Sequence, residues 1–167
     1  MVDVWVQTCF AFSCSPAEMA LLEEVFQASY DLGEHCMLAA RRPSPAMQAL
    51  FPGTDNDCWA GFRDIFPDRD FPSFGAILTG SNLADPQVVT AIVTSEMAFE
   101  PEAVARVIQR CCPATLREAP IGFEWSVTAS RMRVGEFGGG WCAIFPDRIE
   151  IMSTGDALAD ALRTSSS

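Results

Sequence analysis

The sequence predicts an α+β fold, in which one domain holds an antiparallel or mixed β-sheet covered by two main helices. Two observations lead to this class. Apolar residues repeat at every second position in several segments, as in strands, and at helical spacing in others. The chain has 167 residues, which is long enough for one ordinary core and short for two. We therefore expect a single domain over residues 1–163 and a frayed tail at 164–167.

The first strand and the first helix carry the clearest local signals. Between residues 2 and 12, mostly apolar side chains at even positions alternate with a more polar set at odd positions, which predicts a half-buried strand. The segment Ser15–Glu18 then supplies an N-cap serine, a proline at the first helical position and the glutamate of a capping box. The helix is expected to run to about Leu32 and to end at Gly33.

Residues 41–73 predict an irregular insertion that packs onto the core. Five prolines interrupt this stretch, yet it carries large aromatic side chains that a free linker would not have. Asp57 is expected to cap a short helix that carries Trp59, Phe62 and Phe66.

The second half of the chain groups several strands around another helix. An apolar stripe at helical spacing predicts a helix with Pro101 in its first turn, and Pro113 is expected to end it. The other expected elements are strands at 74–79, 88–94, 121–130, 141–145 and 149–152, a turn at 81–86, and a last short helix capped by Ser153 or Thr154. This order favours a ferredoxin-like arrangement or a variant of it with extra strands.

The charge balance restricts the class of partner. The chain has 22 acidic and 11 basic residues, all of the latter arginine, and a net charge of −11. Binding to a phosphate backbone requires clustered basic residues, so we expect no direct binding of nucleic acid. An acidic surface instead suits a protein partner with a basic surface, or serves solubility alone. Glu23, Glu24 and Asp31 lie in one strongly acidic helix and are the acids expected to contact such a partner.

Several other classes of site and location are not expected. No apolar run approaches the roughly 18–20 residues that cross a bilayer, and the apolar N-terminus lacks a basic leader, which predicts a cytoplasmic protein. The seven cysteines are expected to be reduced and mostly buried in the core. Their spacing suits no zinc site, and His35 is the sole histidine, without a Cys–His signature. We therefore predict a non-enzymatic protein without catalytic residues, metal or cofactor.

The glycine-rich segment 131–141 has two interpretations. It lacks the lysine and the Ser/Thr of a phosphate-binding loop, and it lies between two strands, so it could be only a flexible connection. It could also be a contact loop that presents arginines and aromatic rings to a partner. The residues that would make this contact are Arg131, Arg133, Glu136, Phe137 and Trp141.

The last third of the chain contains the strand Gly122–Ser126, with the letters FEWS, then Ser130–Arg133, the glycines 138–140 and Met152–Thr154. In these parts it resembles an uncharacterised group of small proteins from bacterial phages and plasmids. Trp141 stands where that group usually has alanine. The resemblance implies an accessory protein of a mobile genetic element.

Acidity and resemblance together predict an inhibitor of the antirestriction or anti-CRISPR type, which binds a basic surface of a host or defence protein. Two alternatives stay open at this point. One is an immunity protein that neutralises a cognate toxin, and the other is a small ligand-binding protein or enzyme that uses the 131–141 loop.

Overall fold

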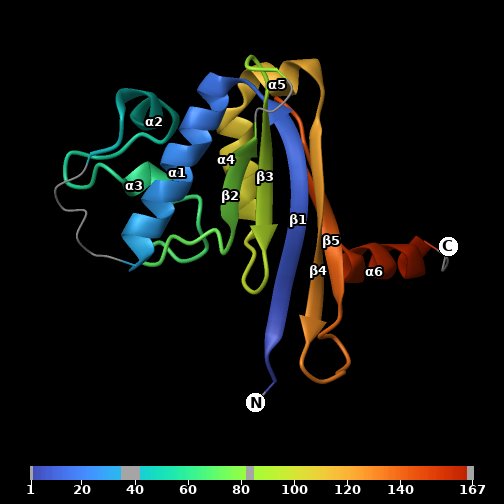
Figure 1. Ribbon diagram of the computed structural model, residues 1–167. Helices are drawn as coiled ribbons and strands as arrows, with labels where there is room; N and C mark the ends of the chain where they lie inside the picture. Colours follow the sequence, from blue (N-terminus) through green and yellow to red (C-terminus); the bar gives the residue numbers. More distant parts are fainter. Residues whose placement is uncertain (1, 35–41, 82–84, 165–167) are drawn as a thin grey trace.

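The computed structural model describes residues 2–34, 42–81 and 85–164, and these form a six-stranded sheet and six helices (Figure 1). All strand pairs of the sheet are antiparallel, in the order β2-β3-β1-β4-β5-β6. The strands are β1 (Val4–Cys14), β2 (Ile77–Ser81), β3 (Val89–Ser95), β4 (Ile121–Ala129), β5 (Gly138–Ile144) and β6 (Ile149–Ser153). The helices are α1 (Pro16–Glu34), α2 (Pro45–Leu50), α3 (Ala60–Arg63), α4 (Pro101–Cys111), α5 (Pro113–Glu118) and α6 (Thr154–Thr164). The predicted combination of helices with an antiparallel sheet is confirmed.

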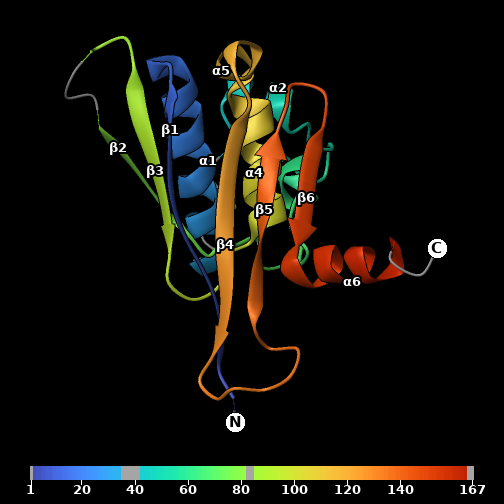
Figure 2. The ribbon, with the colours of Figure 1, turned by 90° about the vertical axis from the view of Figure 1, so that its right-hand side faces the viewer.

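The two faces of the sheet differ in what covers them. Helices α1 and α4 lie on one face, and Figure 2 looks onto the opposite face, where the strands stand in front of these helices. The core lies between the sheet and the helices, where Leu22 and Val104 pack toward Phe12 and Val93. The alternation in β1 produces this arrangement, because its even positions face the core and Cys9 and Ala11 face the open side.

Helix α1 begins as predicted and ends differently. The backbone N–H of Ser15 donates to Glu18 Oε2 at 3.0 Å and the N–H of Glu18 donates to Ser15 Oγ at 3.2 Å, which confirms the capping box. The predicted end at Gly33 is wrong, because the helix continues to Glu34 and Gly33 does not adopt positive φ. Contacts distant in sequence keep the helix in place here, including the hydrogen bond from Ser29 Oγ to the Pro72 carbonyl at 2.7 Å.

The insertion contains two short helices. Ser44 caps α2 by accepting a hydrogen bond from the Met47 N–H at 3.1 Å, and sequence reasoning missed this helix. Asp57 Oδ1 accepts from the Trp59 N–H at 2.9 Å, so Asp57 caps the turn that leads into α3 rather than α3 itself. Phe62 is buried in the core from α3. The segment thus packs against the rest of the fold through its aromatic rings.

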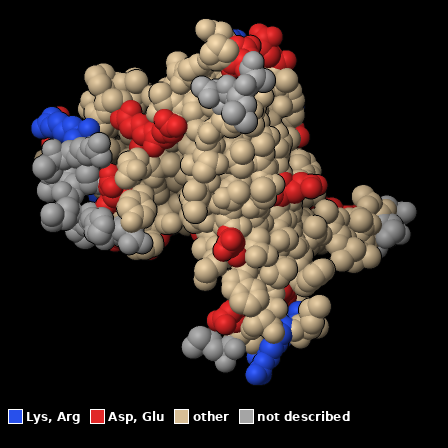
Figure 3. Space-filling view, in the orientation of Figure 1, with Lys and Arg blue, Asp and Glu red and all other residues tan. Residues whose placement is uncertain are grey.

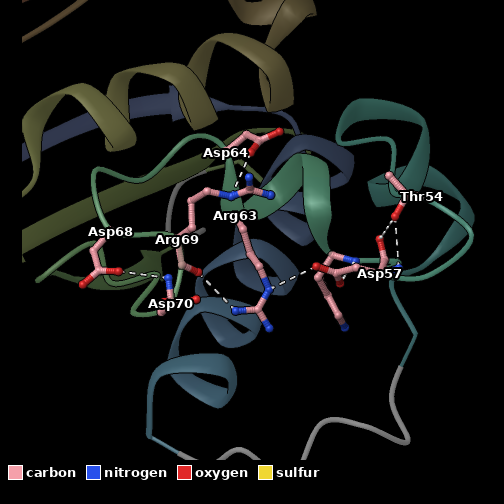
Figure 4. Close-up of polar contacts among 8 residues, drawn as sticks. Thr54, Asp57, Arg63, Asp64, Asp68, Arg69 and Asp70 are labelled. Carbon is pink, nitrogen blue, oxygen red and sulfur yellow. Dashed lines mark hydrogen bonds and ion pairs between the residues drawn. The ribbon is translucent and has the colours of Figure 1, made fainter.

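Ion pairs and side-chain turns hold the outer part of the insertion (Figure 4). Arg63 lies 3.6 Å from Asp57, and Arg69 lies 3.1 Å from Asp64. The Asp70 N–H donates to Asp68 Oδ1 at 2.9 Å. Arg63 and Arg69 are therefore both paired within the insertion.

The start of β2 and the segment after α4 also differ from the sequence prediction. Strand β2 begins at Ile77 rather than at Phe74, because Phe74 is buried in the core and Gly75 turns the chain with φ 58°. Pro113 follows the end of α4 as predicted, but it also starts α5, which sequence reasoning missed. The predicted turn at 81–86 and the tail at 164–167 lie partly outside the described residues.

Candidate functional site

The three acids predicted from α1 line one groove of about 550 Å³. Positions 23, 24, 27 and 31 fall on one side of a helix, because residues three or four apart are neighbours on its surface. The opposite wall comes from the start of the insertion and from the turn before α3. The polar and aromatic residues of the groove are Glu23, Glu24, Gln27, Asp31, Arg42, Ser44 and Trp59.

Two of the three carboxylates are held in place by hydrogen bonds. Glu24 accepts from the Ser44 N–H at 2.9 Å and from the Ser44 hydroxyl at 2.8 Å, so it joins α1 to the N-terminus of α2. Asp31 Oδ1 accepts from Gln27 Nε2 at 2.9 Å, which orients its carboxylate. Glu23 is exposed at the side of the groove. The groove therefore presents fixed negative charge to a cation, and Glu24 also supports the wall.

Trp59 contributes an aromatic surface to the same groove. The residue is 7% exposed, and its ring packs edge-on against Phe62, with ring centroids 6.1 Å apart. The hydrogen bond from its backbone N–H to Asp57 positions this residue. Asp57 in turn pairs with Arg63 (Figure 4). Carboxylates beside an indole are a combination that suits a guanidinium or ammonium group.

The 131–141 segment lies apart from this groove. In Figure 3 one acidic patch lies on the α1 side while other acidic side chains are scattered over the view, and the β4–β5 connection forms the lower end of the molecule, where basic atoms are visible. Arg131 and Arg133 are exposed there, and Phe137 is 74% exposed. Glu136 is half-buried, and its Oε2 has no hydrogen-bond partner in the part of the chain that the structure describes. The two sets of predicted contact residues therefore form two separate surfaces.

The interpretation of glycines 138–140 as part of a flexible loop is wrong. These residues form the start of β5, and Gly139 and Gly140 pair with Ser126 and Trp125 of β4. A Cβ on Gly140 would lie 2.2 Å from Trp125 Cζ2, so the glycine makes room for the indole ring. Their backbone pairs with the neighbouring strands, so these glycines do not form a phosphate-binding loop.

Trp141 is likewise a strand residue. It lies opposite Glu124 on β4 and Met152 on β6, and it is 41% exposed. Its neighbours in the register place it on the open face of the sheet, away from the core position of Cys142. Trp141 and Phe137 thus do not belong to one loop.

Of the six cysteines in the described residues, four are buried as predicted. Cys14, Cys111, Cys112 and Cys142 are buried, and burial raises the pKa of Cys111 and of Cys142 to about 12. Cys9 is exposed, contrary to the expectation from its apolar neighbours, because its odd position in β1 faces the open side of the sheet. Cys58 is half-buried, and Cys36 and His35 lie outside the described residues. Within the ranges that are described, no group of three or more His, Cys, Asp or Glu side chains could hold a metal ion.

A second hollow of about 680 Å³ lies between the ends of β1 and β4 and helix α5. Its buried carboxylate is Glu18, which is 6% exposed. Glu18 accepts hydrogen bonds from Ala114 N–H at 2.8 Å, from Thr115 N–H at 3.0 Å and from the Thr115 hydroxyl at 2.6 Å, besides its bond from Ser15. Both carboxylate oxygens are therefore used by the protein itself, and Glu18 connects the N-termini of α1 and α5.

The hydrogen bonds decide the ionisation of Glu18. Burial acts to raise the pKa of this carboxyl, but the donors from Thr115, Ser15 and Ala114 outweigh it and leave the pKa below its usual range. Sequence reasoning identified Glu18 only as a capping residue of its own helix. The contact with α5 joins positions 97 residues apart and has no local signal.

Searches of protein-family models, curated proteins and solved structures find no match to this chain. Among the helices in the described residues, none is both long and apolar enough to span a membrane. The groove must therefore be interpreted from its own chemistry.

Proposed function

We propose that this protein is a non-catalytic binding domain that holds a basic segment of a protein partner in the groove beside α1. The observation that carries this proposal is the convergence of Glu23, Glu24 and Asp31 on one groove of about 550 Å³, with Trp59 beside them. Arg42 is the one basic residue in its described lining. A lysine or arginine side chain of the partner would find fixed carboxylates there.

Two electrostatic effects would act in such a complex. The net charge of −11 would attract a basic partner over a distance of about one Debye length and accelerate encounter. Pairs formed at the exposed side of the groove would each contribute about 0.2–1 kcal/mol. Binding of this kind depends strongly on salt.

The proposed biological role and class of partner rest on the sequence. The resemblance to small phage and plasmid proteins supports an accessory factor of a mobile element, acting in the cytoplasm on a host or defence protein. An immunity protein that neutralises a toxin would use the same acidic groove. The exposed Phe137, with Arg131 and Arg133, gives a second contact to a partner large enough to reach both ends of the molecule.

We also infer that the fold is a ferredoxin-like variant. Without the short helices α2, α3 and α5, the order is β1-α1-β2-β3-α4-β4, with sheet neighbours β2-β3-β1-β4. This supports the assignment, since α1 and α4 each connect strands that are not adjacent in the sheet. Strands β5 and β6 then extend the sheet on the β4 side.

The groove can be tested with a fluorescent oligo-arginine peptide, followed by anisotropy at low and at physiological salt. We expect Glu23→Gln with Asp31→Asn to weaken binding about tenfold, because two lost pairs together correspond to about 1.4 kcal/mol. Glu24 stays unchanged, since its carboxylate holds Ser44.

The matched control is Glu96→Gln with Asp85→Asn, which removes the same charge from exposed positions outside the groove. We expect it to weaken binding only slightly. If the two double variants weakened binding equally, the peptide would be responding to overall charge. This result would contradict the proposed binding in the groove.

A further inference from the structure

Helix α6 extends from the body of the molecule. Figures 1 and 2 show that it leaves the end of β6 and points beyond this strand, on the side away from α1 and α4. None of its residues is buried. Its start is well formed, because Ser153 Oγ donates to Asp156 Oδ2 at 2.8 Å and the Asp156 N–H donates to Ser153 Oγ at 3.1 Å.

One side of α6 is apolar and the other is charged. Leu158 and Leu162, one turn apart, are each 62% exposed. Ala157 and Ala161 lie beside them on the same side, while the opposite side carries Asp156, Asp160 and Arg163. A helix of 11 residues is marginally stable without packing, so burial of this exposed apolar stripe against another surface would stabilise it.

In the part of the chain that the structure describes, no layer of helices lies over the open face of the sheet (Figure 2), and this face carries little charge. The strand register places Cys9, Ala11 and Ser13 of β1 beside Thr94, Ile92 and Thr90 of β3 on this face. On the other side of β1, the same face carries Ser126 and Thr128 of β4 and Trp141 of β5. Among the described strand positions that the register assigns to it, Glu124 and Glu150 are the charged ones. In a chain of which 20% is charged, such a face has the composition of an interface core.

We propose that the protein forms a symmetric homodimer, in which the open sheet faces of two copies meet and each α6 packs its Leu158–Leu162 stripe against the other copy. A second copy fits better than a basic partner, because a basic surface would find few carboxylates here. Two chains of charge −11 repel each other, and they approach with least repulsion through their least charged surfaces.

A stable dimer needs more buried area than α6 alone can supply, so α6 and the open face of the sheet must both contribute. A helix of 11 residues is about 16 Å long and buries less than the roughly 1,200 Å² of a stable interface. The sheet face supplies the rest, with Trp141 as its aromatic anchor. In a two-fold dimer the helix and the sheet face of each copy are covered by those of the other. The acidic groove lies on the helix-covered side, so it stays open and the dimer does not depend on the proposed peptide binding.

Sedimentation equilibrium of the full chain over the micromolar range tests the dimer. We expect a two-chain mass for the wild type and a one-chain mass for Leu158→Glu with Leu162→Glu. Ala11→Arg, which brings like charges together at the sheet face, is also expected to give a one-chain mass. Ala159→Glu is the matched control, since it adds the same side chain to α6 outside the apolar stripe, and it should stay dimeric.

The thiol of Cys9 gives an independent readout, because it lies on the open face. A thiol reagent should label one more cysteine rapidly in the Leu158→Glu/Leu162→Glu variant than in the wild type, and Cys9→Ser should remove this difference. Circular dichroism shows whether each variant is folded. A one-chain mass for the wild type throughout the range, or a two-chain mass for the folded leucine variant, would overturn the proposal. A two-chain mass for folded Ala11→Arg would overturn it as well, since the sheet faces would then not meet.

Discussion

Glu18→Gln is expected to lower the free energy of unfolding by about 3 kcal/mol, which corresponds to a melting temperature lower by roughly 10 °C for a domain of this size. The carboxylate is 6% exposed and accepts four hydrogen bonds from α5 and from the start of α1. An amide presents N–H groups to some of these donors and leaves them unsatisfied in a buried place. Urea denaturation at neutral pH measures the loss.

The same residue predicts a pH dependence. The pKa of Glu18 is lower in the folded chain than in the unfolded chain, where a glutamate titrates at about 4.3. Its ionised form therefore adds stability above that pH, and this contribution is lost as the pH falls through the lower folded value. We expect the difference in stability between wild type and Glu18→Gln to shrink over this acidic range.

Glu102→Gln is the matched control for Glu18→Gln. Glu102 pairs with Arg106 at 2.7 Å on the exposed side of α4, where such a pair contributes less than about 1 kcal/mol. If Glu18→Gln were no more destabilising than Glu102→Gln, the connection between α1 and α5 would not have the structural role assigned to it.

Gly140→Ala is expected to destabilise the protein by about 3 kcal/mol, through overpacking within the sheet. The added Cβ would lie 2.2 Å from Trp125 Cζ2 and 2.6 Å from the Met152 carbonyl oxygen. The Met152 carbonyl belongs to the backbone of β6 beside Gly140, so this contact can be relieved only by movement of the strand. A thermal melt and urea denaturation together measure the loss.

Gly155→Ala is the control, because a Cβ there would meet only Ser153 Oγ, at 3.9 Å. We expect it to be neutral or slightly stabilising, since alanine suits the first turn of α6 better than glycine. Adding Trp125→Leu to Gly140→Ala should recover part of the loss, giving a coupling energy between the two positions. A fully stable Gly140→Ala protein would mean that residues 138–140 are not part of the strand.

Local interactions made part of the fold predictable. The alternation of β1 and the capping box of α1 depend on neighbours within a few residues, and both are present as predicted. The three acids of α1 could also be assigned to one helix from their spacing. Ser44 and Trp59 complete the groove, and they could not be assigned to it from the sequence. They lie beside α1 only because of the course that the insertion takes.

The sequence by itself determined roughly which segments form strands, where α1 begins and that the exposed side of α1 is acidic. These features follow from the backbone preferences and charges of residues close together in the chain. Only the tertiary structure decided that glycines 138–140 form a strand, since they pair with β4, where the Trp125 carbonyl lies close to Gly139 and the Trp125 ring lies close to Gly140. The same holds for Glu18, whose second set of donors comes from α5. It also holds for α6: its amphipathic pattern is local, but whether its apolar side is covered depends on where β6 ends relative to the rest of the molecule.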